Sequence, residues 1–206
     1  MPGKVKKQFL ASIGRDNPVF AQVLGICSTL AVTNVLENTV VMCLGVIFTL
    51  ACSNLTVSLI RKWIPGSIRM MVETLIIASY VIIVDIVIQA TLPGISRQLG
   101  PYVGLIITNC IIMGRAEAFA LNNEPVPSLV DGIAAGIGYS YILLIIAFFR
   151  ELLGSATIWG YAIPGFSSWW VNWSIMVMAP GAFFALAILI WIIKTYVVRD
   201  EEEGGK

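Results

Sequence analysis

The chain has 206 residues, of which 58% are hydrophobic and 12% are charged, and its formal net charge is +1. Soluble domains carry about 25% charged residues, so this composition predicts an integral membrane protein. The near-neutral charge, without a basic face of interleaved aromatic residues, argues against nucleic acid as a partner. Four cysteines and no histidine argue against a mixed-ligand zinc site and against histidine as a general base.

Residues 1–17 form a basic, polar segment without an apolar run that leads to a small-residue cleavage site. We therefore expect an uncleaved segment rather than a signal peptide. A first membrane segment over residues 19–33 has 15 residues, fewer than the about 20 that a spanning helix needs. Two spanning runs follow, over residues 39–60 and 70–92, and a loop is expected over residues 93–101.

A second short segment, residues 102–114, has 13 residues and is again too short to span comfortably. Spanning runs are expected at 132–149 and 175–193. The connection over residues 155–172 is rich in tryptophan, glycine and proline, which suits the membrane surface.

Two sets of short, long and long segments predict an all-α integral membrane protein of six transmembrane helices. Residues 1–206 form one domain, with a first repeat over 18–92, a second over 101–198 and a tail over 199–206. This topology places 11 of the 13 basic residues on one side, so the positive-inside rule predicts that both termini are cytoplasmic. With three segments each, the repeats are inverted, and the two short half-helices should meet near the bilayer midplane.

A proline opens each short segment and a cysteine follows nine positions later, Pro18 with Cys27 and Pro101 with Cys110. Proline suits the first helical turn, so each thiol is expected roughly 13 Å into its helix. Thiolates select iron–sulfur clusters, zinc or copper(I). Cysteine also packs as a small buried hydrophobe, so ligand and structural roles both stay open at this point.

Cys43 and Cys52 lie nine residues apart on one expected helix, about half a revolution around its axis. They should face opposite ways, and we expect both to be structural. An iron–sulfur cluster usually takes four thiolates. A complete cluster site would therefore need two thiolates from a second protein.

Several ionisable residues fall within or beside the expected spans. Glu73 and Asp85 are functional candidates because ionisable side chains are costly in a membrane. For Asp85 the alternatives are a part in sodium or proton conduction and a pairing with an arginine or asparagine of a neighbouring helix. Arg115 and Glu117 are expected to anchor the interface as a mutual pair, or to tune a cluster potential. Arg150 and Glu151 are expected to anchor a helix end.

Residues 108–120, with the sequence TNCIIMGRAEAFA, resemble a signature of the NqrDE/RnfAE family. These are membrane subunits of the sodium-pumping NADH:quinone reductase (Nqr) and of the related Rnf ferredoxin:NAD complexes. Further runs fit the same pattern: LGICSTLA at 24–31, Arg69 after Ile64-Pro65, Asp131-Gly132, and RELLG at 150–154. The resemblance covers nearly the whole chain and is weakest over residues 1–17 and from Trp159 onward.

The resemblance implies that two homologous proteins of opposite orientation each give two cysteines to one intramembrane [2Fe–2S] cluster. Cys27 and Cys110 match the motif positions, so they would ligate iron together with two thiolates of the homologous protein NqrE. The implied six-subunit complex lies in the bacterial inner membrane, oxidises NADH, reduces ubiquinone and exports sodium ions. Flavins and NADH would bind other subunits, and this chain would hold no catalytic residue of its own.

Ile107-Thr108 and the short tail favour a subunit of an Nqr complex over the corresponding subunit of an Rnf complex, which is RnfE. Two alternatives remain. One is a metal-free inverted-repeat transporter for a small solute, with a polar path near Asp85, Gln89 and Asn109. The other is a purely structural membrane subunit. Whether sodium ions or protons move, and whether they pass through this chain, is left open by the sequence.

Overall fold

A computed structural model describes residues 24–91, 93–155, 157–158, 161–162 and 178–204. The first part of the chain forms α3 (Ile26–Val32), α4 (Leu36–Ile60), the 3₁₀ turn η1 (Gly66–Ile68), α5 (Arg69–Thr91) and α6 (Pro93–Ile107). The second part forms α7 (Cys110–Arg115), the π-helix η2 (Ala116–Ala120), α8 (Pro125–Ser155), strands β1 (Thr157–Ile158) and β2 (Tyr161–Ala162), and α10 (Ala179–Gly204).

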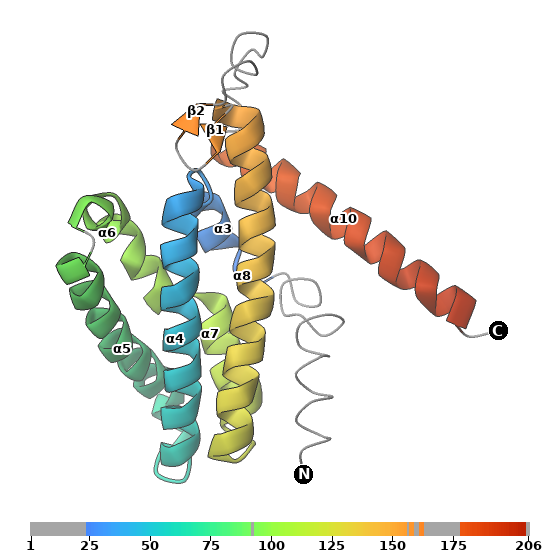
Figure 1. Ribbon diagram of the computed structural model, residues 1–206. Coiled ribbons are helices and arrows are strands. Elements are labelled where there is room, and N and C mark those ends of the chain that lie inside the picture. Colours follow the sequence, from blue (N-terminus) through green and yellow to red (C-terminus); the bar gives the residue numbers. More distant parts are fainter. Residues whose placement is uncertain (1–23, 92, 156, 159–160, 163–177, 205–206) are drawn as a thin grey trace.

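Helices α4 and α8 form the axis of the molecule and run antiparallel, side by side (Figure 1). Two glycines of α8 permit this close approach. A Cβ atom on Gly132 would lie 3.0 Å from the carbonyl oxygen of Leu50, and one on Gly136 would lie 3.1 Å from the Ile47 side chain. Membrane helices pack through such small residues because lipid supplies little hydrophobic driving force between them.

Helix α5 packs against α4 on the outside of this pair, and α6 contacts both α5 and α4 (Figure 1). In the most apolar stretch of α5, 22% of residues are buried, against 56% in α4 and 61% in α8. Its outer face carries large apolar side chains such as Met71, Ile82 and Ile86. In a membrane protein such a face lies against lipid or a partner subunit.

Within the described residues, four helical stretches are long and apolar enough to cross a membrane: Leu36–Ile60, Gly66–Thr91, Gly100–Ala120 and Pro125–Gly154. The expectation that the segment over residues 102–114 is too short to span is therefore wrong, because the helical stretch that contains it continues to Ala120. A shorter apolar stretch, Pro180–Ile192, belongs to α10, which extends away from the other helices (Figure 1). The predicted helical membrane fold is therefore confirmed, with the short hairpin of β1 and β2 as an addition that was not expected. The amino-terminal part of the first short segment and most of the 155–172 connection lie outside the described residues.

Residues 93–101 are helical, so the loop expected there is wrong. Pro93 occupies the first position of α6, where its missing N–H would be unpaired in any helix. Pro101 lies inside α6 rather than at its start, and membrane helices tolerate an internal proline when neighbouring helices support them. The last helix also continues to Gly204, beyond the end expected at residue 193.

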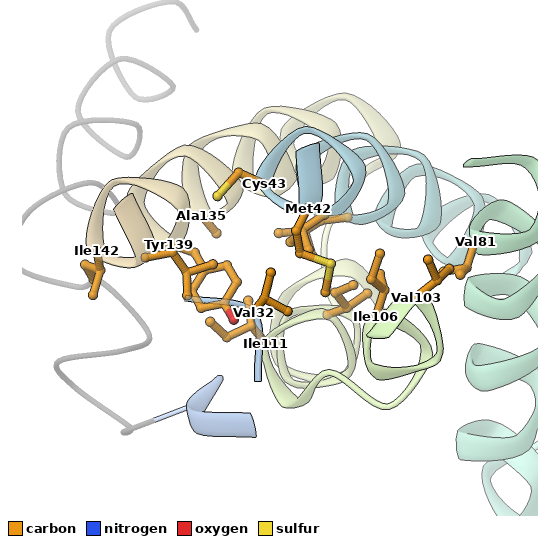
Figure 2. Close-up of a cluster of buried hydrophobic side chains, with 14 of the residues drawn as sticks. Val32, Met42, Cys43, Val81, Val103, Ile106, Ile111, Ala135, Tyr139 and Ile142 are labelled. Carbon is orange, nitrogen blue, oxygen red and sulfur yellow. The ribbon is translucent and has the colours of Figure 1, made fainter. Parts of the chain in front are cut away.

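The core is centred where α3, α6 and α7 meet the middle of α4 and α8. Figure 2 shows Tyr139 reaching from α8 toward Val32 and Ile111, with Met42 and Cys43 on the α4 side. Ile111 and Ile112 of α7 have no exposed surface. The short helices are thus held by tertiary packing, since helices of six or seven residues have little stability alone.

Candidate functional site

Cys110 lies at a break between two helices. Helix α6 ends at Ile107, Asn109 is extended with φ −69° and ψ 119°, and α7 begins at Cys110 itself. The Asn109 side chain accepts a hydrogen bond from the N–H of Ile111 at 3.1 Å. Asparagine is a favoured N-cap because its carbonyl oxygen satisfies an orphan donor of the first turn. The expected continuous helix over 102–114 is therefore wrong, because the capped break falls immediately before the thiol.

Cys27 has a closely similar local setting. Gly25 adopts a left-handed conformation with φ 85°, and α3 begins at Ile26, so Cys27 is the second helical residue. Glycine allows this conformation at no steric cost. Both thiols thus lie in the first turn of a short helix, and neither lies two and a half turns into one as expected.

The two helix starts contact each other. The side-chain amide of Asn109 donates a hydrogen bond of 2.9 Å to the hydroxyl oxygen of Ser28. A Cβ atom on Gly25 would lie 2.9 Å from Ile111, and one on Gly114 would lie 3.1 Å from Leu24. Position 28 thus contacts 109, position 25 contacts 111 and position 24 contacts 114. Because the numbers fall in one stretch as they rise in the other, the two stretches run antiparallel. The predicted meeting of two opposed half-helices is confirmed.

This junction lies halfway along α8. The hydroxyl of Tyr139 donates a hydrogen bond of 3.2 Å to the carbonyl oxygen of Gly25, and Tyr139 is 1% exposed. Tyr139 comes 14 residues after Pro125 in the 30-residue span Pro125–Gly154, about 21 Å along the helix at 1.5 Å per residue. The junction therefore stands at the middle of a membrane-spanning helix.

The polar residues of the junction are buried, whereas the thiols are accessible. Ser28 and Asn109 are at most 1% exposed. Cys27 is exposed, Cys110 is half-buried, and both are free thiols. Among the described residues, no group of three or more histidine, cysteine, aspartate or glutamate side chains could hold a metal ion. Within the described part of the chain, the junction therefore offers two thiols at mid-depth.

Cys43 and Cys52 are placed differently. Cys43 is buried in the core, and its thiol lies 3.9 Å from the carbonyl oxygen of Ser140 on α8. Cys52 is half-buried on α4. Neither residue lies in the first turn of a short helix, and the packing is consistent with the structural role expected for both.

The charged side chains near the π-helix form two ion pairs between elements. Arg115 pairs with Asp131 of α8, with its Nε 2.9 Å from the carboxylate, and Arg69 of α5 pairs with Glu117. The mutual Arg115–Glu117 pair expected from the sequence is therefore wrong. Residues two apart on a helix point in different directions, so each finds its partner on another element.

The two acidic residues of α5 have different surroundings. Asp85 accepts a hydrogen bond of 2.7 Å from Gln89, one turn along its own helix, rather than from a neighbouring helix. Glu73 is 1% exposed, and its Oε1 atom has no hydrogen-bond partner among the described residues. A groove of about 340 Å³ between α4 and α5 is lined by apolar side chains and Thr91, without Asp85, Gln89 or Asn109. This groove does not support the polar path of a solute transporter.

Arg150 and Glu151 are buried, at 2% and 3% exposure, so their assignment as a helix-end anchor is wrong. Arg150 donates to the hydroxyl of Thr33 at 2.5 Å and to the carbonyl oxygen of Leu30 at 3.4 Å. Glu151 accepts from the backbone N–H of Leu36 at 2.7 Å. The sequence signal that could have indicated this role is an adjacent pair of opposite charges within an apolar run.

Replacing Asn109 by alanine is expected to lower the stability of the assembled protein by about 1–3 kcal/mol, because the variant loses a helix cap and leaves Ser28 without its donor. The thermal unfolding midpoint of the purified protein in detergent measures this. Asn122→Ala is the matched control, since Asn122 is exposed and its side-chain amide donates locally, to the carbonyl oxygen of Ala118 in the preceding π-helix, at 3.3 Å. Equal midpoints for the two variants would contradict the assignment.

The fold and the junction together define a class: a multi-pass helical membrane protein whose discontinuous short helices meet at mid-depth and present free thiols. The model of the Rnf-Nqr subunit, membrane protein, family matches residues 5–190. The chain belongs to this family, and it is a membrane subunit of an Rnf/Nqr-type complex. Members of the family work within multisubunit, redox-driven, ion-translocating complexes.

Proposed function

We propose that Cys27 and Cys110 supply two of the four thiolates of an intramembrane [2Fe–2S] cluster, and that a homologous protein of opposite orientation supplies the other two. The observation that carries this proposal is the Asn109–Ser28 hydrogen bond of 2.9 Å. It joins the two residues that adjoin the cysteines in sequence, and so brings together two cysteine-bearing stretches whose thiols are 83 positions apart in the chain.

The donor set fits half of such a cluster. Iron–sulfur clusters are held by cysteine thiolates, commonly four of them. Cys27 and Cys110 are free and accessible, and no third candidate ligand gathers with them in the described part of the chain. A site divided between two proteins accounts both for the incomplete ligand set and for an exposed thiol at mid-depth.

When bound, the cluster would accept and release one electron within the membrane. The side chains of this chain have other tasks. Asn109 and Tyr139 hold the two helix starts through Ser28 and the Gly25 carbonyl, which limits the movement of the ligands. Fully buried Ile111 and Ile112 keep water from the inner side of the junction.

Within the family, we propose that this chain is the subunit NqrD of an Nqr complex, and that the homologous subunit NqrE is its partner. Ile107-Thr108 before the Asn-Cys pair supports this choice over the Rnf form. The whole complex would oxidise NADH through flavin-bearing subunits, reduce ubiquinone and export sodium ions across the bacterial inner membrane. The single domain over 1–206, with its repeats over 18–92 and 101–198 and cytoplasmic termini, is part of the same proposal.

Cys110→Ala in the assembled complex tests the proposed function. The complex should lose the iron of one cluster, and NADH-driven quinone reduction should fall to background because the electron path is broken. Iron is measured by chemical assay and turnover by quinone reduction. Cys52→Ala is the matched control and should keep both values. Iron and turnover that survive Cys110→Ala would favour the alternative of a purely structural role.

A further inference from the structure

Helix α3, which carries Cys27, is attached at both ends to one face of α8. Near its start, Tyr139 donates to the Gly25 carbonyl at 3.2 Å. Near its end, Arg150 donates to Thr33 at 2.5 Å and to Leu30 at 3.4 Å. Tyr139 and Arg150 are 11 residues apart, about three helical turns, so they lie on the same face of α8.

The contact at the end of α3 is chemically specific. The last carbonyl groups of a helix have no partner within it, and a positive charge there is favourable. Arg150 donates a hydrogen bond to one of these carbonyl groups and places a positive charge beside them, although its side chain is only 2% exposed. Burial of an arginine is costly unless its donors are paired, and the end of α3 supplies two of the acceptors that pair them.

Glu151 holds the other side of the same turn. Its carboxylate accepts a hydrogen bond of 2.7 Å from the N–H of Leu36, the first residue of α4. The first N–H groups of a helix lack partners within it and favour a negative charge. Two adjacent residues of α8, Arg150 and Glu151, therefore fix the end of α3 and the start of α4 together.

We propose that Arg150 and Glu151 are positioning residues for Cys27. They clamp the turn over residues 33–35 to α8, and α3 transmits this constraint over the two turns back to its thiol. A helix of seven residues has little stability of its own, so its hydrogen bonds to neighbouring elements, those to α8 among them, determine where its first turn lies. The inference rests on the proposed function insofar as it takes Cys27 for a cluster ligand.

The test uses the purified complex with Arg150→Met, Arg150→Lys and Thr33→Val. Arg61→Met is the matched control, because Arg61 also donates to a backbone carbonyl, that of Asn123 at 2.6 Å, but at the opposite end of α4. Two readouts are taken. One is the electron paramagnetic resonance spectrum and midpoint potential of the cluster, and the other is the rate at which N-ethylmaleimide alkylates Cys27, assigned by mass spectrometry.

We expect Arg150→Met to broaden the resonance and shift the potential. It should also raise alkylation of Cys27 about tenfold, because the proposed partner protein covers this thiol in the complex and a loosened α3 would expose it more often. Arg150→Lys should restore much of both values, and Arg61→Met should match the wild type. A wild-type spectrum and a wild-type alkylation rate in Arg150→Met would overturn the inference.

If the complex with Arg150→Met does not assemble, Thr33→Val is used instead. This variant removes one acceptor of Arg150 and leaves the guanidinium in place. It should change both readouts in the same direction by a smaller amount, and wild-type values would overturn the inference. A wild-type complex without any cluster signal would refute the proposed function instead. The alkylation rates would still decide whether Arg150 positions Cys27.

Discussion

Gly25→Ala is expected to displace the start of α3 and to abolish the junction between the two short helices. A Cβ atom at this position would lie 2.7 Å from the Tyr139 ring and 2.9 Å from Ile111. The backbone φ of 85° adds about 1–2 kcal/mol of strain for any L-residue, and overpacking of a core adds about 1–3 kcal/mol. The thermal unfolding midpoint should fall, and cluster content should fall with it.

Gly66→Ala is the matched control for this prediction. Gly66 lies in the turn before α5, and a Cβ atom there would meet nothing within 4 Å. The control should retain the wild-type midpoint and cluster content. If Gly25→Ala behaved as Gly66→Ala does, the tight contact among Gly25, Tyr139 and Ile111 would be refuted.

The second large effect is expected at the buried pair between Arg115 and Asp131. The Asp131 side chain is fully buried and that of Arg115 is 17% exposed. Arg115→Met should lower the free energy of unfolding by about 3–5 kcal/mol, because it takes the arginine cation away from a buried carboxylate. Denaturation of the purified protein in detergent, followed by circular dichroism, measures the loss.

Two further variants test the physical reason. The double variant Arg115→Met with Asp131→Leu should recover a large part of the loss, since replacing both members of a buried pair by apolar groups is often tolerated. Arg69→Met should cost no more than about 1 kcal/mol, because the Arg69–Glu117 pair is roughly 40% exposed. A double variant as unstable as Arg115→Met would show that the lost stability does not come from the buried carboxylate.

The class of fold and the positions of the half-helices follow from the sequence because both depend on length and hydropathy. A run of 20 or more apolar residues has few alternatives to a membrane-spanning helix. Short segments were expected to end inside the membrane, which predicted that the stretches bearing Cys27 and Cys110 meet there. The stretches do meet, although the one bearing Cys110 belongs to a helical stretch of crossing length, Gly100–Ala120. The prediction that the two repeats are inverted came from counting the segments in each.

The details of the junction depend on local competition that hydropathy does not report. Asn109 ends α6 because its side chain caps the next helix, a role that also occurs in turns and loops. Gly25 could equally have been a packing glycine, as Gly132 is, and its positive φ appears only in three dimensions. These two residues move each thiol from inside a helix to its first turn.

The charge pairs were the hardest features to predict. Arg115 and Glu117 are close in sequence, yet their partners, Asp131 and Arg69, come from other elements. Arg150 and Glu151 resemble a solvated helix end in sequence, but they are buried against α3 and α4. In each case the partner depends on which helices pack together, and this is information that the spacing along one helix does not contain.

Electron paramagnetic resonance of the reduced, assembled complex tests the central proposal most directly. The wild type and Cys52→Ala should show one intramembrane [2Fe–2S] signal, and Cys27→Ala and Cys110→Ala should each lack it while the other subunits remain assembled. A signal of unchanged shape and intensity in either of the last two variants would contradict the assignment of these thiols as iron ligands.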